Sequence, residues 1–320
     1  MPIATIIGNT SWGNALGALL SEKGTAVRLW ARSEAEAEEL NQGSHPYTST
    51  CDIEEALCGA DLVIWAVPSQ KLRENVKQAS KYLTDSMLFM SAVKGLEVDT
   101  GRRMSQVLAE EIAPHLRRRI CVLSGPNLAR EISQGLPAAS VIAAQDEAVA
   151  ETARQVMESP RFLLSTSSDV VGVELGGSLK NIIALGAGMI DGLDLGDNAK
   201  GAFMAWGWRE AVSLGFALGA SADTFYGLAG LGDLIATCAS NLSRNHYVGY
   251  ELAKGRTLQE ISASMTNVAE GVATTRAAHR LAGKHGLDLP IVSLIHGMLF
   301  EGLSPGRALV DFRAPAGSRC

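Results

Sequence analysis

The chain has 320 residues, which is long enough for two folded units and excludes a miniature scaffold. Hydrophobic residues make up 47% and charged residues 19%, so a large apolar core is possible and a disordered chain is excluded. The formal net charge of -6 excludes an overall positive field that would hold nucleic acid or an anionic membrane, so a local cluster of charges has to bind any anionic ligand.

The amino terminus and the cysteines favour a cytoplasmic protein. Met1-Pro2-Ile3 begins without a basic region, and the chain reaches Gly8 too soon for a signal peptide. The five cysteines include no Cys-x-x-Cys pair and no nearby His at ligand spacing, which favours reduced thiols over disulfides or zinc. Charges or clustered glycines interrupt the long apolar stretches, so we expect no membrane span. No set of metal ligands is apparent in the sequence, so we also expect no metal site.

From residue 1 to about 165, short β-branched runs alternate with polar helical stretches, which is typical of βαβ units in a parallel sheet. The expected strands are Ile3–Ile7, Ala26–Trp30, Leu62–Val67, Met87–Ser91, Ile120–Ser124, Ala138–Ile142 and Phe162–Ser165. The expected helices are Asn14–Glu22, Ser33–Leu40, Gln70–Leu83, Arg102–Ile112 and Glu147–Met157. This half therefore predicts a doubly wound α/β domain over residues 1–168.

After Asp169 the β-branched runs become scarce, and apolar residues recur at helical spacing. The expected helices are Val170–Ile190, Ala199–Leu218, Val272–His285 and Ile291–Phe300, with Gly286 ending the third and Pro290 opening the fourth. The second half, residues 169–320, is expected to be all-helical.

The segment Gly8-Asn9-Thr10-Ser11-Trp12-Gly13 lies between the first strand and the first helix, where a dinucleotide-binding turn belongs. Gly8 suits the tight turn and Gly13 suits close helix packing, while the helix start offers N–H groups to pyrophosphate. Thr10 replaces the middle glycine of the usual pattern. An ordinary glycine-bearing turn is the alternative.

Arg32 follows the second strand, at the place where an NAD-selective site has Asp or Glu for the ribose hydroxyls. A guanidinium there can pair with a 2′-phosphate, so we expect NADP as the preferred cofactor, with NAD also possible. An exposed arginine at a strand end, with no part in binding, is the alternative.

Lys180 is the only charged residue between Glu174 and Asp191, and Asp233 is isolated among glycines and aliphatic residues. Because an unpaired buried charge is costly, we infer that Lys180 and Asp233 contact each other or a shared ligand. The alternatives are a lysine that reaches water at a rim and a purely structural ion pair.

Further polar residues lie where strands end or helices begin. Lys94 follows a predicted strand, at the edge where α/β proteins bind ligands. Two turns have the residues of anion sites, namely Ser124-Gly125-Pro126-Asn127 and Ser243-Arg244-Asn245-His246. Ordinary helix capping is the alternative for both.

Taken together and in order, these motifs resemble those of the bacterial NAD(P)-dependent sn-glycerol-3-phosphate dehydrogenases over nearly the whole chain. The stretches that carry the resemblance are Ser11-Trp12-Gly13, Val93-Lys94-Gly95, Gly125-Pro126-Asn127-Leu128-Ala129, Val173 to Asn181, Gly230-Leu231-Gly232-Asp233-Leu234, Ser243-Arg244-Asn245 and Glu270-Gly271. The resemblance implies a Rossmann domain, a helical substrate domain, a homodimer, and interconversion of dihydroxyacetone phosphate and glycerol 3-phosphate for phospholipid synthesis.

The resemblance also implies roles for individual residues. Lys180 is the expected proton acceptor in oxidation and donor in reduction, Asp233 orients its ammonium group, and Arg244 binds the substrate phosphate. The substrate-binding positions are Lys94, Gly125, Asn127, Lys180, Asp233, Ser243, Arg244 and Asn245. The cofactor-contacting positions are Ser11, Trp12, Arg32, Lys94, Ala129, Arg244, Val268 and Glu270, together with Gly8 and Gly13 of the turn.

The chain departs from the family pattern at Thr10, at Lys200, where Arg is usual, and at Trp206, where the family has another Arg. Thr10 is expected to affect cofactor affinity, although its hydroxyl could bind a phosphate oxygen. Lys200 and Trp206 are expected to affect helix packing or dimer contacts. Two rival functions stay open: a keto-acid or hydroxy-acid reductase of the same plan, and a dinucleotide sensor that has lost turnover. Arg244-Asn245 speaks against the first and the isolated Lys180 and Asp233 against the second.

Overall fold

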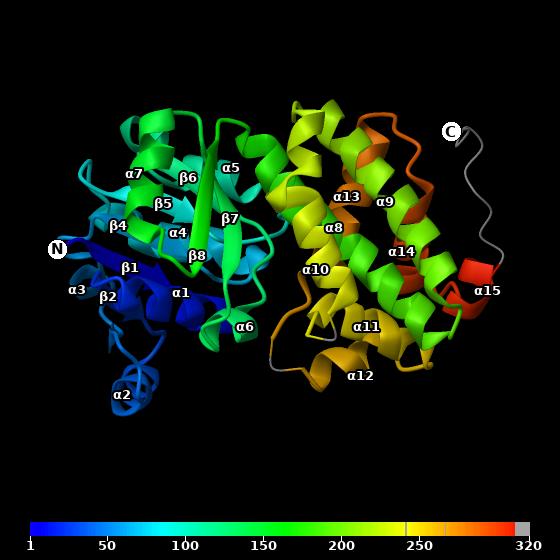
Figure 1. Ribbon diagram of the computed structural model, residues 1–320, viewed down its shortest axis with the longest axis horizontal. Helices are drawn as coiled ribbons and strands as arrows, with labels where there is room; N and C mark the ends of the chain where they lie inside the picture. The colour runs from blue at the N-terminus through cyan, green and yellow to red at the C-terminus, as the bar shows by residue number, and fades with distance from the viewer. Residues whose placement is uncertain (241, 266, 311–320) are drawn as a thin grey trace.

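The computed structural model describes residues 1–240, 242–265 and 267–310. A sheet with helices on both faces is built from the first half of the chain, and a unit of helices alone follows (Figure 1). This confirms the expected fold class. We propose residues 1–168 and 169–320 as the two domains, because the last strand, β8 (Phe162–Ser167), ends there and the first helix of the second unit, α8 (Val170–Gly192), begins.

The sheet has the strand order β3-β2-β1-β4-β5-β6-β7-β8. Its other strands are β1 (Ile3–Ile7), β2 (Ala26–Trp30), β3 (Thr48–Thr50), β4 (Leu62–Trp65), β5 (Leu88–Ser91), β6 (Ile120–Ser124) and β7 (Ala138–Ala144). The order of β1 to β6 is that of a doubly wound sheet whose winding reverses between β1 and β4. The ligand crevice of such a sheet lies at the carboxyl ends of these strands.

Two features of the sheet differ from the sequence prediction. β7 runs antiparallel to β6, with Cys121 opposite Ala144, whereas parallel pairing is expected from the sequence pattern. The segment between them forms only the short helix α6 (Ala129–Ser133) before the chain turns back, and the apolar pattern of a buried strand is the same in both directions. β3 is missing from the prediction because its residues, Thr48–Thr50, are polar and lie at the sheet edge.

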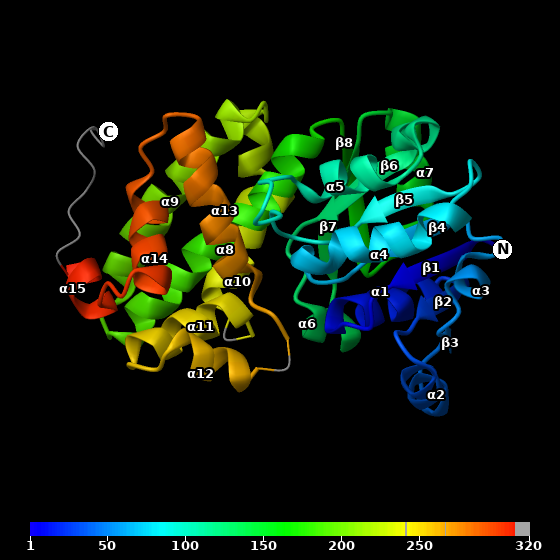
Figure 2. The same cartoon turned by 180° about the vertical axis from the view of Figure 1, so that it is seen from behind.

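Strand side chains alternate between two apolar cores, one on each face of the sheet. Ile6 packs in the core shared with α1 and α7, and Ile7 packs in the core shared with α4 and α5. Figure 2 shows α4 and α5 across this second face, and α2 stands apart near β2 and β3.

The helices of the sheet unit, besides α6, are α1 (Ser11–Glu22), α2 (Glu34–Gln42), α3 (Ile53–Leu57), α4 (Leu72–Ala79), α5 (Met104–Glu111) and α7 (Glu147–Met157), with short 3-10 turns at Ser69–Lys71, Ser80–Tyr82 and Pro114–Arg119. The single helix expected over Gln70–Leu83 is therefore shorter, with a 3-10 turn at each end.

The helical unit is built around α8, which packs against α9, α10, α11 and α13. The remaining helices are α9 (Asp197–Ala217), α10 (Asp233–Ala239), α11 (Arg244–Ala253), α12 (Leu258–Ala263), α13 (Glu270–Lys284), α14 (Pro290–Phe300) and α15 (Pro305–Val310), with a 3-10 turn at Ala222–Tyr226 and a π-helical turn at Leu228–Gly232. The four helices predicted in this half are present, with Pro290 in the first turn of α14.

Glycines explain how closely α8 and α11 approach each other. A Cβ atom added at Gly188 of α8 would lie 2.0 Å from the carbonyl oxygen of His246, and one at Gly249 of α11 would lie 1.9 Å from that of Leu185. Backbone therefore packs on backbone at this crossing. Because α11 carries Ser243-Arg244-Asn245 at its start, the crossing also fixes these residues relative to Lys180.

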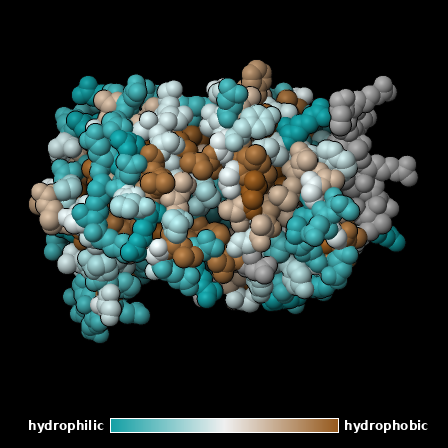
Figure 3. Space-filling view, viewed as in Figure 1, coloured by the Kyte–Doolittle hydropathy of each residue, from teal (hydrophilic) through white to brown (hydrophobic). Residues whose placement is uncertain are grey.

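By length and composition, α8 is apolar enough to cross a membrane, which corrects the expectation that no stretch qualifies. Its most apolar window is 89% buried inside the protein, as in the core helix of a folded domain. Figure 3 shows apolar side chains gathered over the middle of one face of the molecule, whereas the end near α2 is polar. Exposed large apolar side chains of the helical unit include Phe216, Tyr226 and Ile235.

Candidate active site

Lys180, Asp233 and Lys94 form a charged cluster where the sheet meets the helical unit. Lys180 projects from the middle of α8, Asp233 is the first residue of α10, and Lys94 follows β5. Lys180 Nζ donates to Asp233 Oδ1 at 2.7 Å, and Lys94 Nζ donates to Asp233 Oδ2 at 2.7 Å. Asp233 is 1% exposed and Lys180 is 6% exposed. The contact inferred from the sequence is therefore present, and Lys94 shares the same carboxylate.

Thr237 completes the surroundings of Lys180 and is missing from the sequence-based candidates. Its hydroxyl accepts a hydrogen bond from Lys180 Nζ and lies 3.3 Å from Asp233 Oδ1. Thr237 stands one turn after Asp233 on α10, so both side chains face α8. The helical spacing of Asp233 and Thr237 is the signal that could have identified it.

Lys94 has an unusual electrostatic environment. Burial lowers the pKa of its ammonium group to about 8; Asp233 opposes the shift, whereas the charges of Lys180 and Arg244 add to it. Two lysines share the single Asp233 carboxylate, so the cluster carries excess positive charge while both are protonated. An anionic substrate would neutralise this excess.

The turn after β6 supplies polar groups beside Lys94. The carbonyl oxygen of Gly125 accepts a hydrogen bond from Lys94 Nζ at 2.7 Å. A Cβ atom at Gly125 would lie 2.6 Å from Ser140 Oγ, so only glycine fits without displacing the neighbouring strand. Asn127 Oδ1 accepts a bond from Ser140 Oγ at 2.6 Å, and its buried Nδ2 has no partner among the described residues. Asn127 therefore has a donor available for a ligand.

Arg244 and Ser243 lie at the start of α11. The Ser243 hydroxyl caps the helix by accepting from the N–H of His246 at 3.2 Å. Arg244 makes no hydrogen bond or ion pair with any residue that the structure describes. Partial burial lowers the pKa of its guanidinium, and Glu270 opposes this shift. The structure thus leaves the five donors of Arg244 available for an anion.

Asn245 is used inside the protein. Its Nδ2 donates to Asn181 Oδ1 at 2.8 Å, and its Oδ1 accepts from the N–H of Gly271 at 2.8 Å. The amide therefore joins α8, α11 and the start of α13. One of the two N–H groups of Nδ2 is used in the bond to Asn181, and the role of Asn245 in substrate binding stays a prediction.

The turn after β1 has the geometry of a phosphate-binding loop. Gly8 has a φ of 131°, and a Cβ atom there would lie 2.6 Å from the carbonyl oxygen of Ala66. A Cβ atom at Gly13 would lie 2.1 Å from the Gly8 carbonyl oxygen, so both glycines are required by space. The exposed Ser11 and the half-buried Trp12 open α1, where backbone N–H groups have no acceptor within the helix.

The hydroxyl of Thr10 is already used by the protein. It accepts from the N–H of Gly13 at 3.0 Å and donates to the carbonyl oxygen of Ala66 at 2.8 Å. Thr10 is thus the N-cap of α1, which corrects the expectation that its hydroxyl is available for a phosphate oxygen. The side chain ties the loop to the end of β4 instead.

The other cofactor candidates are spread along one edge of the molecule. Trp12 Nε1 donates to the carbonyl oxygen of Ala92, which ties the start of α1 to the segment that carries Lys94. Ala129 opens α6, which packs against α1. Arg32 lies at the end of β2, three strand positions from β5, or roughly 14 Å along the sheet. This spread suits an extended ligand.

Glu270 connects the helical unit to the sheet unit. Its carboxylate accepts from the N–H of Ser69 at 2.8 Å and from the Ser69 hydroxyl. Burial raises the pKa of Glu270, while the bonds from Ser69 and the charge of Arg244 oppose the shift. Val268 lies nearby in the chain and is 50% exposed, so it is accessible to a ligand. Ser69 is a second site residue that the sequence-based candidates miss.

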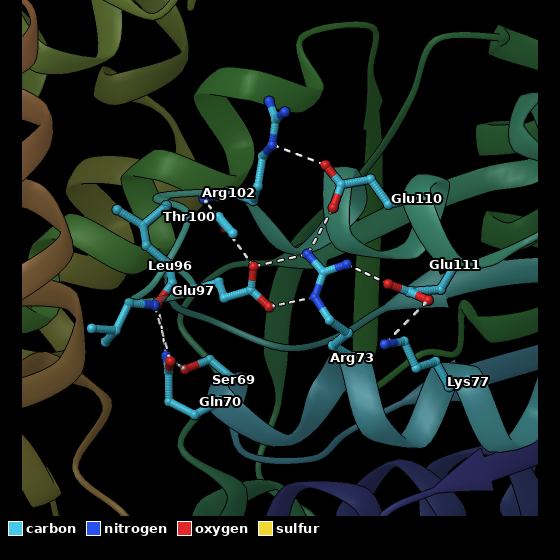
Figure 4. Close-up of polar contacts among 11 residues, drawn as sticks. Ser69, Gln70, Arg73, Lys77, Leu96, Glu97, Thr100, Arg102, Glu110 and Glu111 are labelled. Atoms are coloured by element: carbon cyan, nitrogen blue, oxygen red, sulfur yellow. Dashed lines mark hydrogen bonds and ion pairs between the residues drawn. The ribbon is translucent and has the colours of Figure 1, made fainter.

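A network on the sheet side holds the loop that follows Lys94 (Figure 4). Gln70 donates to the carbonyl oxygen of Leu96 at 2.8 Å and accepts from the N–H of Val98 at 3.0 Å. Arg73 pairs with both oxygens of Glu97, at 2.7 and 2.8 Å. The same guanidinium contacts two acidic residues of α5, Glu110 and Glu111. These contacts position the backbone on which Lys94 is carried.

Comparison with known proteins decides the family. Residues 3–150 match the family described as NAD-dependent glycerol-3-phosphate dehydrogenase N-terminus, and residues 169–310 match the family described as NAD-dependent glycerol-3-phosphate dehydrogenase C-terminus. The chain belongs to the glycerol-3-phosphate dehydrogenase family. This confirms the resemblance stated from the sequence motifs and the expected enzyme class, an NAD(P)-dependent oxidoreductase.

Individual glycerol-3-phosphate dehydrogenases are similar over nearly the full length. The chain is 52% identical over 316 residues to glycerol-3-phosphate dehydrogenase (NAD(P)+) of Dehalococcoides mccartyi, covering 95% of this chain and 88% of that protein. It is 43% identical over 314 residues to the enzyme of Streptomyces coelicolor, covering 94% and 93%. The crystal structure of glycerol-3-phosphate dehydrogenase from Coxiella burnetii matches with a TM-score of 0.91 at 32% identity, covering 97% and 98%.

The other departures from the family pattern have local explanations. Lys200 of α9 pairs with Asp191 at the end of α8, with Nζ 2.9 Å from Oδ2. His246 Nε2 contacts the same Asp191 oxygen at 2.7 Å, so the side chain of His246 is engaged away from Arg244. Trp206 packs against the core of the helical unit.

The residues present fit a dinucleotide. The first turn of α1 contains no acidic residue, and the N–H groups of its start suit pyrophosphate. The charges of Lys180 and Arg244 both act on Lys94, so positive charge gathers at this cluster. Within the described ranges, no group of three or more His, Cys, Asp or Glu residues is arranged to hold a metal ion.

Proposed function

We propose that this dehydrogenase interconverts dihydroxyacetone phosphate and sn-glycerol 3-phosphate with Lys180 as the proton-transferring group. The family carries out this reaction and thereby supplies glycerol 3-phosphate for phospholipid synthesis. The observation that supports the role of Lys180 is its burial beside Asp233 and Thr237, at the junction where sheet and helical unit meet. A purely structural ion pair would not require a second lysine on the same carboxylate.

Bound NAD(P)H supplies a hydride to the ketone carbon. In our proposal, the Lys180 ammonium donates a hydrogen bond to the carbonyl oxygen, stabilises the charge that develops there and transfers a proton to it. In the oxidative direction the neutral amine accepts the hydroxyl proton. Asp233 and Thr237 hold Nζ in place, because two of its hydrogen bonds are directed to them and the third can be directed to the substrate.

The phosphate end of the substrate requires separate donors. We propose that Arg244 binds the phosphate, because its guanidinium makes no hydrogen bond or ion pair with the described residues and can form two parallel bonds to phosphate oxygens. Asn127 contributes its Nδ2, which has no partner in the described part of the chain, and Lys94 contributes positive charge beside Lys180. Ser243 positions the start of α11, where Arg244 is attached.

For the cofactor, we propose that both NADH and NADPH are used and that NADPH is preferred. The support is Arg32 at the end of β2, where its exposed guanidinium can meet a 2′-phosphate. Ser11, Trp12 and Ala129 are the proposed contacts at the sheet side, and Val268 and Glu270 those of the helical side. Gly8 and Gly13 make the turn that leaves room for pyrophosphate.

We propose a cytoplasmic homodimer as the working form. The exposed apolar side chains of the helical unit, Phe216, Tyr226 and Ile235 among them, offer surface for contact with a second copy. Light scattering after size exclusion should give twice the mass of the chain. A monomer at assay concentrations would contradict this part of the proposal.

The function is tested with purified protein, NADPH and dihydroxyacetone phosphate, by following the absorbance of the reduced nicotinamide. Oxidation of NADPH should require the phosphate ester of the substrate, so dihydroxyacetone without phosphate should be a poor substrate. Lys180→Ala should lower kcat by about 10² to 10⁴, the usual contribution of a positioned acid or base. Lys284→Ala, at an exposed lysine of α13, is the matched control and should keep full activity. Wild-type turnover in Lys180→Ala would refute the assigned role.

A further inference from the structure

Glu36 lies in the first turn of α2, at the carboxyl ends of β1 and β2, and is not among the residues assigned above. Its carboxylate accepts from the backbone N–H of Arg32 at 2.7 Å and from Asn9 Nδ2 at 2.8 Å. The Arg32 guanidinium is 3.4 Å from the same carboxylate. The Glu36 side chain is only 17% exposed, whereas that of Arg32 is 82% exposed. The acid is therefore fixed, and the arginine extends into solvent above it.

This position is where doubly wound dinucleotide-binding domains distinguish the two cofactors. A carboxylate near the end of β2 hydrogen-bonds the ribose 2′-hydroxyl of NAD, whereas an arginine accommodates the 2′-phosphate of NADP. Such a carboxylate ordinarily occupies the strand end itself, which in this chain is Arg32. Here an acid from the next helix reaches back to that place, so both kinds of group are present side by side.

The charge of Glu36 is maintained by its neighbours. Partial burial acts to raise the pKa of the carboxyl group, but hydrogen bonds from Arg32 and Asn9 outweigh it and leave the pKa below its ordinary value. Asn9 is itself held by Asn14, whose Nδ2 donates to Asn9 Oδ1 at 3.1 Å. The carboxylate is thus part of the wall of the phosphate loop, and its negative charge persists at neutral pH.

We propose that Glu36 determines cofactor specificity: its carboxylate binds the ribose hydroxyls of NADH and repels the 2′-phosphate that Arg32 attracts. The proposal rests on the proposed function, because it assumes that a nicotinamide dinucleotide lies along this edge of the sheet. It adds to that function a second, opposing group beside Arg32. The consequence is that the chain accepts both cofactors, with a smaller preference for NADPH than Arg32 alone would give.

The test measures binding rather than turnover. Dissociation constants for NADH and NADPH are obtained from nicotinamide fluorescence, and those for 5′-AMP and 2′,5′-ADP from calorimetry, with wild type, Glu36→Gln and Glu38→Gln. Glu38 is an exposed acid on the same helix and serves as the matched control. In Glu36→Gln we expect the affinity ratio of NADPH to NADH to rise roughly twofold to fivefold, the size of an interaction between partly exposed charges. Glu38→Gln should leave the ratio unchanged.

Each alternative outcome can be recognised. A merely structural role of Glu36 in holding the loop would weaken NADH and NADPH equally, so an unchanged ratio in Glu36→Gln overturns the proposal. Arg32→Ala, tested in the same way, should weaken NADPH and 2′,5′-ADP while leaving 5′-AMP unchanged; equal losses for all ligands would also contradict it. If the wild-type protein binds neither reduced cofactor, the proposed function itself fails, which is a different result.

Discussion

At the residue scale, the central feature is the Asp233 carboxylate, which each of two lysines contacts through a different oxygen. Lys180 was identifiable from the sequence because a lone charge in an apolar helix needs a partner. Its other partner, Thr237, could be identified only from its position one turn after Asp233, because a threonine on an apolar helix usually has no role beyond packing. Likewise Glu36 is one of several acids in α2, and only the fold shows that it alone reaches Arg32 and Asn9.

A first prediction at this scale concerns pH. Burial lowers the pKa of Lys94 to about 8, so the group is charged below pH 8 and neutral above it. A neutral amine attracts a phosphorylated substrate less, so the KM for dihydroxyacetone phosphate should rise as the pH increases through 8. Lys94→Arg keeps its charge across this range, because arginine is not deprotonated in proteins. The test measures steady-state KM values between pH 6.5 and 9.5, roughly the range that brackets this pKa. Parallel KM profiles for the wild type and Lys94→Arg would contradict the prediction.

At the scale of elements, the two halves differed in how much of them could be predicted. The four helices predicted in the second half, α8, α9, α13 and α14, follow from the 3.6-residue apolar period, and the structure has them within a few residues of the predicted bounds. The shorter helices α10, α11, α12 and α15 have no predicted bounds, because they contain too few turns to show that period. The direction of β7 did not follow from the sequence, because a strand buried on both faces reads the same either way. The closeness of α8 and α11 was not evident either, since glycines in a helix can also mark weak helical propensity.

The α8–α11 crossing yields a prediction for stability. Gly188→Ala places a Cβ atom 2.0 Å from the backbone oxygen of His246, so the helices must separate. We expect the free energy of unfolding to fall by about 3 kcal/mol, near the upper range for overpacking. Gly201→Ala in α9 is the control, because a Cβ atom there meets nothing within 4 Å and should be neutral or stabilising by up to about 1 kcal/mol. Urea unfolding compares the two; equal midpoints would refute the role of the crossing.

At the scale of the whole molecule, several contacts join the two units besides the Lys94–Asp233 pair. The buried Glu174 of α8 accepts from the Arg103 guanidinium and from the backbone N–H of Ser105 at 2.7 Å. The Ser105 hydroxyl donates to the same carboxylate at 2.6 Å. Glu270 contacts Ser69 in the same way from α13. Such contacts between segments far apart in sequence depend on docking of the units, and no local sequence pattern predicts them.

The Arg103–Glu174 pair provides a test of this docking. Arg103→Met removes the cation and leaves a carboxylate that is 5% exposed without its countercharge. We expect the free energy of unfolding to fall by about 3 kcal/mol, as for other buried pairs that lose one partner. Lys71→Met breaks an exposed pair with Glu74 and should change it by less than about 1 kcal/mol. Tryptophan fluorescence reports unfolding of both units, since Trp65 lies in the sheet and Trp208 in α9. Similar losses of unfolding free energy in Arg103→Met and Lys71→Met would contradict this prediction.

The shared carboxylate links chemistry to architecture. Lys94 is carried by the sheet unit, whereas Lys180 and Asp233 are carried by the helical unit. If the units moved apart, Lys94 would lose its counter-ion Asp233, and the sheet unit would be separated from Lys180 and Thr237. Neither half alone therefore holds the complete cluster, and the geometry around Asp233 depends on how the two units dock.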